Sequence, residues 1–243
     1  FLGKDPVATT FIQLNRRFTE FTPGTVEEEG GRYIHHWMGG TLGWDELLAF
    51  PLVVMFAEGG SGKTQELIHK TKDLTRQGEF AFFIALEQLV DLQLTETLQV
   101  DAAEFERWKA SSETATFFLD SVDEAKLRSP SDFRKALARV RSALGAAAGR
   151  ARFVVSTRPH AWVEETDRQA MMDAFGVAEQ VQQTGSAGGT EAIKSHVFVQ
   201  LLPLDIEQIR VFARSSGVSE VQEFIEELDR ADAMKYATRP VDL

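Results

Sequence analysis

Residues 57–64 read AEGGSGKT and follow a short apolar run at residues 53–56, which predicts a buried strand. A helical pattern continues over residues 65–75. Glycines in such a loop let consecutive backbone N–H groups point at phosphate oxygens, and the helix that follows adds the positive end of its dipole. We expect Lys63 to reach the β- and γ-phosphates and the Thr64 hydroxyl to bind Mg²⁺.

The first position of this loop is Ala57, where the usual pattern has Gly. Glycine-rich turns between a strand and a helix also occur in α/β proteins without nucleotides, but Gly-Gly-Ser-Gly-Lys-Thr after an apolar strand favours a nucleoside triphosphate site. The residues expected to contact the nucleotide here are Glu58, Gly59, Gly60, Ser61, Gly62, Lys63, Thr64 and Gln65.

A second group of polar residues follows an apolar run at residues 117–119, where Asp120, Asp123 and Glu124 lie within five positions. A carboxylate at the end of a buried strand is costly unless it has a cation or solvent nearby. Downstream of a phosphate loop, we expect Asp120 to support Mg²⁺, directly or through water. Asp123 and Glu124 would orient or deprotonate an attacking water. The alternative is an acidic loop that caps the next helix.

A third polar group ends the apolar run at residues 153–155, where Ser156, Thr157, Arg158 and Pro159 follow. Because the carboxyl ends of parallel strands meet at one edge of a sheet, Arg158 is placed to sense the γ-phosphate. The alternative is a surface arginine before a proline turn.

Apolar runs and helical periodicity alternate along the chain and predict an α/β fold with a five-stranded parallel P-loop NTPase sheet covered by helices on both faces. Two further helices lie outside this alternation and predict the start of a small helical subdomain. The expected strands are 53–56, 80–86, 116–119, 151–156 and 196–202, and the expected helices are 65–75, 102–110, 131–144 (capped by Ser131), 161–175, 205–214 and 219–231.

The segments around these elements predict three parts: an N-terminal extension or linker (1–43), a nucleotide-binding core (44–203) and the truncated helical part (204–243). The extension is expected to hold a short strand or hairpin that ends at residues 23–24 and a solvated acidic loop at 27–31. His35 and His36 are expected to pack rather than bind metal. A short amphipathic helix is expected at 44–50, and residues 182–189 are expected to form a loop.

The composition limits the function classes. The chain has 243 residues and a formal net charge of −11, which disfavours broad non-specific binding to nucleic acid or to an anionic membrane. It has no cysteine, which excludes disulfides and thiolate metal sites and is compatible with a reducing cytoplasm. No apolar run approaches the roughly 18–20 residues that span a bilayer. Both ends look cut from something longer, so we expect a fragment. Because it lacks cysteine and a membrane-spanning run, we expect it to be cytoplasmic.

The three polar groups, in this order, resemble the motifs of a NACHT module, a family of the STAND class of signal-transduction ATPases within the AAA+ lineage. Ser121 stands where that family commonly has Gly. The end of the chain, residues 236–243, resembles the family's proline motif, and by this match Pro240 is a candidate adenine contact. The resemblance covers about residues 44–243 and is strongest to bacterial members, which include antiphage defence proteins of the Avs type.

The resemblance implies an ATP/ADP switch that uses Mg²⁺. A sensor recognises a trigger ligand such as a phage protein, ATP replaces ADP, the protein self-associates and an effector is released. No membrane or nucleic-acid partner is indicated. Two other classes remain open. One is a scaffold that holds nucleotide with negligible turnover, and the other is a different phosphate-loop enzyme such as a helicase or a small-molecule kinase.

Overall fold

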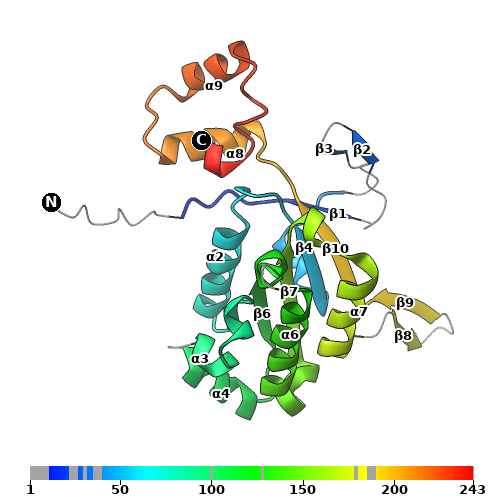
Figure 1. Cartoon of the computed structure of the whole chain (residues 1–243). Helices are drawn as coiled ribbons and strands as arrows, with labels where there is room; N and C mark the ends of the chain where they lie inside the picture. The colour runs from blue at the N-terminus through cyan, green and yellow to red at the C-terminus, as the bar shows by residue number, and fades with distance from the viewer. Residues whose placement is uncertain are drawn as a thin grey trace.

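A mixed six-stranded sheet forms the centre of the protein (Figure 1). The computed structural model describes residues 11–21, 27–29, 32–34, 40–98, 101–126, 129–177, 180–184 and 190–242. The strands follow the order β1-β10-β4-β7-β6-β5. Their bounds are β1 (Phe18–Glu20), β4 (Leu52–Phe56), β5 (Phe80–Ala85), β6 (Ala115–Asp120), β7 (Ala151–Thr157) and β10 (His196–Leu201).

Five of these strands, from β10 to β5, pair in parallel, as their continuous apolar runs predict. The expected count of five strands is nevertheless wrong, because β1 joins the edge of the sheet antiparallel to β10, with Phe18 opposite Leu201. β1 is only three residues long, which is too short for its pattern of apolar and polar residues to indicate which strand it pairs with. The division at residues 43 and 203 stays a prediction, with β1 contributed to the sheet by the first part.

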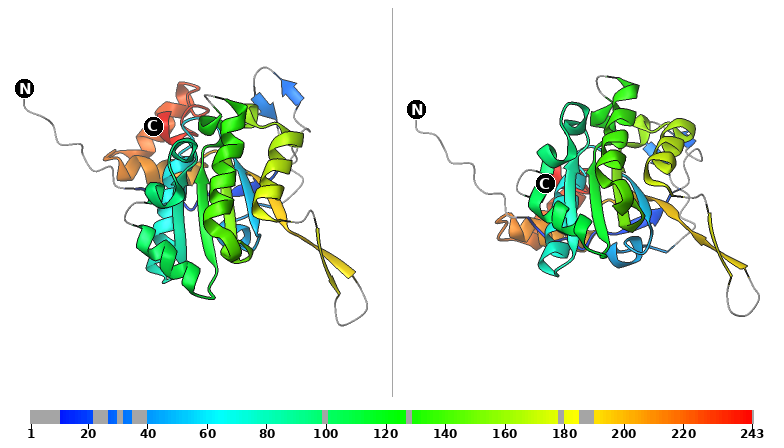
Figure 2. Two further views of the ribbon diagram at one scale, coloured as in Figure 1. Left: turned by 60° about the horizontal axis from the view of Figure 1, so that its bottom comes forward. Right: turned by 90° about the horizontal axis from the view of Figure 1, so that it is seen from below.

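Helices cover both faces of the sheet (Figures 1 and 2). Successive strand residues point to opposite faces, so Val53 and Met55 pack with α1 and α2, whereas Val54 and Phe56 lie in the core on the other side. The helices of the core are α1 (Trp44–Leu47), α2 (Lys63–Arg76), α3 (Leu94–Leu98), α4 (Ala102–Ala110), α5 (Val122–Ala125), α6 (Pro130–Leu144) and α7 (Glu164–Phe175).

Two helix starts differ from expectation because of prolines. α6 begins at Pro130, and its N-cap is Ser129 rather than Ser131, since the Ser129 hydroxyl accepts a 3.2 Å hydrogen bond from the Ser131 N–H. Proline suits a first helical position because its φ is preset and its missing N–H has no helical partner there. α7 begins at Glu164 rather than at residue 161, because Pro159–Ala161 form a separate 3₁₀ turn.

Two predicted loops contain strands. The acidic stretch is the strand β2 (Glu27–Glu29), which pairs antiparallel with β3 (Arg32–Ile34). The strand β8 (Gln180–Thr184) pairs with β9 (Thr190–Lys194) and includes the first part of the segment predicted as a loop at 182–189. These polar strands lack the apolar pattern that marks buried ones. Residues 185–189, His35 and His36 lie outside the described residues.

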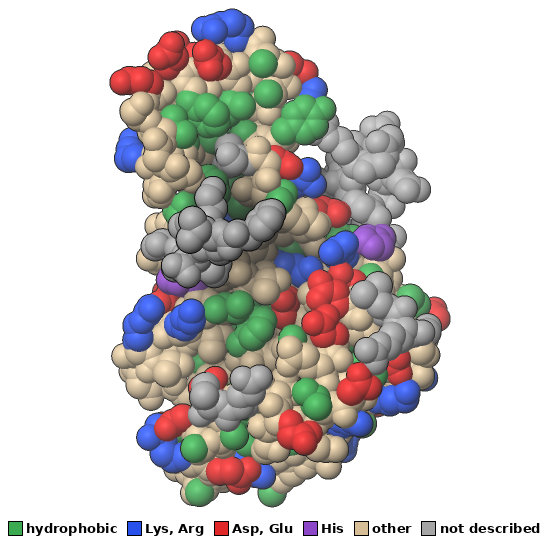
Figure 3. All heavy atoms as spheres, turned by 60° about the vertical axis from the view of Figure 1, so that its left-hand side comes forward, with side chains coloured by type: hydrophobic (Ala, Val, Ile, Leu, Met, Phe, Trp, Pro, Cys, Tyr) green, Lys and Arg blue, Asp and Glu red, His purple; other side chains and the backbone are tan. Residues whose placement is uncertain are grey.

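The helical part forms a lobe of its own, with α8 (Ile206–Ser215), α9 (Val221–Arg230) and the 3₁₀ turn η5 (Pro240–Asp242). The Asp205 side chain caps α8, whereas α9 has no side-chain cap. Buried Leu14 packs into this lobe with Ile209 and Ala237. The lobe lies beyond the end of the sheet at which α2 begins, and the described part of the N-terminal segment passes between the two (Figure 1). The space-filling view shows a smaller upper lobe above the larger body (Figure 3). Within the described ranges, no helix is long and apolar enough to cross a bilayer.

Candidate phosphate-binding site

The glycine-rich loop joins β4 to α2 at the carboxyl edge of the parallel strands. Gly60 and Gly62 adopt left-handed backbone angles, with φ of 76° and 86°, which side chains at these positions would disfavour. Gly62 is the N-cap of α2, and no side chain caps this helix. The first N–H groups of a helix have no helical acceptor, so this 14-residue helix presents free donors and a positive dipole end to an anion.

The Thr64 hydroxyl and the Asp120 carboxylate meet at this edge. Thr64 Oγ1 donates a 2.6 Å hydrogen bond to Asp120 Oδ2. The other carboxylate oxygen accepts a bond from the Ser156 hydroxyl, which itself accepts a 3.0 Å bond from the Ser121 N–H. Asp120 is buried at the end of β6. Side chains from α2 and β7 therefore fix the orientation of one carboxylate at the end of β6.

This pair of residues suits Mg²⁺, which prefers hard oxygen ligands and is commonly held in phosphate-loop proteins by a hydroxyl and a carboxylate. The residues that the structure describes contain no group of three or more His, Cys, Asp or Glu side chains that could hold a metal. Protein ligands alone would thus be few, and phosphate and water oxygens would complete the coordination.

Asp123 lies between two cations. Its Oδ1 is 4.0 Å from Lys63 Nζ, and its Oδ2 is 2.9 Å from Arg158 Nε. The Arg158 Nε–H does not point at the carboxylate, so the contact is an ion pair without a directed hydrogen bond. Lys63 and Asp123 are both buried, so each charge depends on the other for compensation. The two cations expected to face phosphate are therefore held by a carboxylate in this structure.

Arg158 lies against the phosphate loop. A Cβ at Gly59 would lie 3.9 Å from the guanidinium carbon, and 38% of the Arg158 side chain is exposed. The strand β7 ends at Thr157 beside the loop, because Phe56 at the end of β4 is in register with Thr157. This position at the sheet edge is the one expected from the sequence.

Glu124 has a carboxylate neighbour that the sequence did not indicate. Burial is the largest cause that raises the pKa of Glu124, followed by a hydrogen bond with Glu87 and the charge of Glu87; the charge of Lys63 lowers it. Glu87 follows β5, and the adjacent Leu86 N–H donates a 3.0 Å bond to the Asp120 carbonyl. The only available signal was that Glu87 ends an apolar run, as Asp120 does.

Arg16 was also missed. This buried side chain donates from Nη1 to the Ser61 carbonyl at 2.7 Å and from Nη2 to the Leu202 carbonyl at 2.6 Å. Its burial lowers the pKa of the guanidinium. In the sequence it lies in an isolated polar pair with Arg17, far from any motif. No local pattern could have connected it to the loop.

The C-terminal segment packs on the phosphate loop. A Cβ at Gly60 would lie 2.2 Å from Cγ1 of Val241, and one at Gly62 would lie 3.4 Å from Cγ of Pro240. The Val241 N–H lies 3.4 Å from the Gly60 carbonyl oxygen. The predicted nucleotide contact Pro240 is thus beside the loop, next to the start of α2.

The remaining expected residues also lie in or after the loop. The Glu58 carbonyl accepts a 3.3 Å bond from the Ser61 N–H, and the Ser61 hydroxyl is buried without a hydrogen-bond partner. Gln65 is in the first turn of α2, with its side chain exposed. The group of Gln65 that could contact a phosphate is therefore its backbone N–H, at the start of α2.

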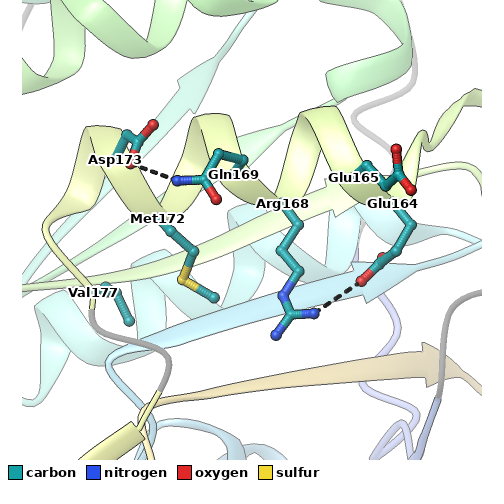
Figure 4. Close-up of a pocket in the computed structure, with 7 residues that line it drawn as sticks. All are labelled: Glu164, Glu165, Arg168, Gln169, Met172, Asp173 and Val177. Atoms are coloured by element: carbon teal, nitrogen blue, oxygen red, sulfur yellow. Dashed lines mark hydrogen bonds and ion pairs between the residues drawn. The ribbon is translucent and has the colours of Figure 1, made fainter.

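A separate hollow lies along α7 and does not belong to this site (Figure 4). Its polar side chains pair along the helix: Arg168 lies 3.4 Å from Glu164, and Gln169 donates a 2.8 Å bond to Asp173. None of the expected site residues lines it. The lining residues are Glu164, Glu165, Arg168, Gln169, Met172, Asp173 and Val177.

The likeness of this chain to known proteins is structural and distant. No protein-family model and no curated protein sequence matches this chain. Among solved structures, the Walker-type ATPase of Pyrococcus abyssi is similar, with 14% sequence identity and a TM-score of 0.39. The match covers 75% of this chain and 60% of that protein. A likeness this distant carries no functional assignment.

Proposed function

We propose that this protein is a phosphate-loop NTPase that binds a nucleoside triphosphate with Mg²⁺ and hydrolyses it slowly. The observation that carries the proposal is the 2.6 Å bond between Thr64 and Asp120 at the start of the uncapped helix α2. A free helix N-terminus, a hydroxyl and a strand-end carboxylate at one edge of a parallel sheet are the parts that phosphoryl transfer needs.

In this proposal each residue of the site has one task. The loop backbone at residues 59–64 and the Lys63 ammonium bind the phosphates. Thr64 and Asp120 hold Mg²⁺, which when bound supplies charge neutralisation at the phosphate oxygens. Glu124 accepts a proton from the attacking water, and Arg158 distinguishes the triphosphate by contact with the γ-phosphate.

We assign Asp123 a second task in addition to the water handling that its sequence position suggests. Its carboxylate compensates Lys63 and Arg158, at 4.0 and 2.9 Å. Phosphate oxygens carry the same sign of charge and would replace Asp123 as the partner of both cations. Release of the Asp123 carboxylate toward the water site would then accompany triphosphate binding.

We further propose that the nucleotide is ATP or ADP. We also propose that the protein is a NACHT-type switch that recognises a trigger ligand in bacterial antiviral defence and self-associates. Two observations support this finer reading. Pro240, the candidate adenine contact, lies beside Gly62. Ser121, at the position where the resembling family has Gly, adopts a φ of 66°, an angle that glycine accommodates most readily.

A second candidate is a scaffold that holds nucleotide without turnover. The observation that favours it is the raised pKa of Glu124, which burial and Glu87 cause. A hydrogen bond between the carboxyl groups of Glu124 and Glu87 needs a proton between them, and a carboxyl group that holds this proton is a poor acceptor for a proton from water. If the Glu87 contact persists with nucleotide bound, the site retains the nucleotide and hydrolyses it very slowly.

The test is to denature the purified protein and identify any released nucleotide by chromatography, and to measure phosphate release from added ATP with and without Mg²⁺. Bound adenine nucleotide with Mg²⁺-dependent release supports the ATPase. Bound adenine nucleotide without measurable release supports the scaffold. A guanine nucleotide contradicts the adenine assignment, and failure to bind any triphosphate contradicts the proposal as a whole.

A further inference from the structure

We propose that Arg16 is a positioning residue for phosphate binding, which acts through the peptide between Ser61 and Gly62. Its guanidinium holds the Ser61 carbonyl, and thereby aims the Gly62 N–H at the phosphate, while it places a buried positive charge behind the loop. This inference rests on the proposed nucleotide site. The residue lies outside every motif that the sequence shows and comes from the N-terminal segment.

Arg16 is buried and is held by two hydrogen bonds to backbone carbonyls. The side chain is 4% exposed, and its Nη1 donates to the Ser61 carbonyl at 2.7 Å. Its Nη2 donates to the Leu202 carbonyl at 2.6 Å, just after β10 ends. A fork with two donors fixes the direction of the guanidinium plane, which a single bond would leave free.

The charge of Arg16 is not compensated by an ion pair. Among the described residues, no carboxylate lies within ion-pair distance of it, and its Nε has no hydrogen-bond partner. The charge of Glu66 raises the guanidinium pKa of Arg16, but less than burial lowers it. A buried charge without a counterion is unfavourable. A polyphosphate in the adjacent loop would supply the missing negative charge.

The peptide geometry connects Arg16 with the ligand. In a trans peptide the carbonyl and the following N–H point in opposite directions, so a Ser61 carbonyl held by Arg16 sends the Gly62 N–H away from Arg16. A cationic donor on the carbonyl also polarises the peptide and strengthens its N–H as a donor. Arg16 lies close to this unit, since a Cβ at Gly62 would lie 3.7 Å from its Nη1.

The matched comparison is Arg16→Gln against Arg17→Gln. Both remove one positive charge from neighbouring positions, but Arg17 is exposed and Arg16 is buried. Calorimetry would measure the affinity of each variant for ATP and for inorganic tripolyphosphate, which lacks the base and sugar, at two salt concentrations. Lys63→Ala serves as the reference for loss of the phosphate site, and thermal melting checks that each variant folds.

We expect Arg16→Gln to weaken ATP and tripolyphosphate equally, by about tenfold, since a charge-assisted bond and a nearby charge are lost. The Arg17→Gln variant should bind both ligands as the wild type does. The affinity of Arg16→Gln for both ligands should depend less on salt than that of Arg17→Gln, because a charge that attracts phosphate has been removed. A purely structural role would lower the affinity by the same factor at both salt concentrations. Arg16→Lys retains the charge and one donor and should recover part of the loss.

Several results would overturn the inference. If Arg16→Gln binds both ligands as Arg17→Gln does while Lys63→Ala loses them, the inference fails and the proposed function stands. A loss for ATP alone would place Arg16 at the nucleoside and not at the phosphates. If Arg16→Gln does not fold, an Arg16→Lys variant that folds and binds with wild-type affinity and salt dependence overturns the positioning role. Wild-type protein that binds neither ligand refutes the proposed function itself.

Discussion

Thr64 and Asp120 are joined by a 2.6 Å hydrogen bond although 56 positions separate them in the sequence. Thr64 lies in the first turn of α2, and Asp120 is the last residue of β6. The carboxylate is oriented on its other side by the Ser156 hydroxyl. The three residues come from three different polar groups of the sequence, so the fold brings all of them to one edge of the sheet.

The first prediction concerns Asp120→Asn, which preserves the shape of the side chain and removes its charge. We expect nucleotide binding without metal to change little, whereas the gain in affinity on addition of Mg²⁺ should fall about tenfold or more, because an amide is a poor Mg²⁺ ligand. Calorimetric titration of ATP with and without Mg²⁺ measures this. Asp132→Asn is the control, since Asp132 is a buried carboxylate paired with Lys135 on α6. Equal Mg²⁺ responses in the two variants would contradict the metal assignment.

The second prediction concerns Lys63→Ala. The variant loses the buried ammonium next to the loop and should bind ATP at least tenfold more weakly, as expected for a charge-assisted contact with phosphate. Fluorescence or calorimetric titration with ATP measures the effect. Lys72→Ala removes an exposed lysine from the same helix and should leave the affinity unchanged. Unaltered ATP binding by Lys63→Ala would remove the loop from the proposed site.

The third prediction concerns the pH dependence of hydrolysis. The pKa of Glu124 is raised by burial and by Glu87, and a proton acceptor must be ionised, so the rate should fall as the pH drops through a value above the ordinary Glu pKa of 4.5. Glu87→Gln removes the competing carboxylate and should move this acid limb to lower pH. Glu124→Gln should retain ATP binding and lose most hydrolysis. A pH–rate profile that Glu87→Gln does not shift would contradict the coupling.

The same raised pKa affects stability in a predictable direction. A carboxyl group whose pKa is higher in the folded state costs stability when it is ionised, so the cost is absent below pH 4.5 and grows as the pH rises through the raised folded pKa. Glu124→Gln should therefore unfold at a higher temperature than the wild type at neutral pH, with the two melting points converging toward pH 4. Thermal melting at both pH values measures this.

The fourth prediction concerns Arg158→Ala. Removal of the guanidinium beside Gly59 should leave ADP binding nearly unchanged and reduce the preference for ATP over ADP, by about tenfold if one charge-assisted contact is lost. Competition between the two nucleotides measures the preference. Arg152→Ala, at the other end of β7, is the control. An unchanged preference would leave Arg158 as a partner of Asp123 alone.

The fifth prediction concerns Ser121, whose φ of 66° is unfavourable for a residue with a side chain and whose hydroxyl is buried without a partner. Ser121→Gly relieves both and should stabilise the fold by about 1 kcal/mol, or roughly 2–4 °C in Tm. Ser121→Ala removes only the hydroxyl and should give a smaller gain. Calorimetric melting distinguishes the two, and a lower Tm for Ser121→Gly would show that the serine has a stabilising contact.

The features of this molecule that could be predicted are those that a short stretch of sequence determines by itself. Each of the five parallel strands contains an apolar run, and the loop before Lys63 combines glycines with a following helix. Asp120 and Arg158 were placed at one sheet edge because parallel strands end together. These inferences need only the direction of each strand.

The missed features depend on contacts between distant segments. Arg16 and Ser61 are 45 positions apart, and nothing around Arg16 marks it as buried. The partner of β1 is β10, from the far end of the sheet-forming chain. Glu87 and Glu124 meet because β5 and β6 are neighbours, and strand order is not encoded in either run. The strands of the β2–β3 and β8–β9 hairpins consist largely of polar residues, so apolar runs in the sequence do not identify them.

Because Val241 contacts Gly60, binding of a ligand to the phosphate loop would be thermodynamically coupled to the position of the C-terminal segment. A Cβ at Gly60 would lie 2.2 Å from Val241, so the space over this glycine is already filled by the valine. A ligand that presses on Gly60 must compete with Val241, and one that needs Val241 in place must reinforce it. By thermodynamic reciprocity, a partner that binds α8 and α9 and displaces Val241 would alter nucleotide affinity by the same factor by which nucleotide alters the affinity for that partner.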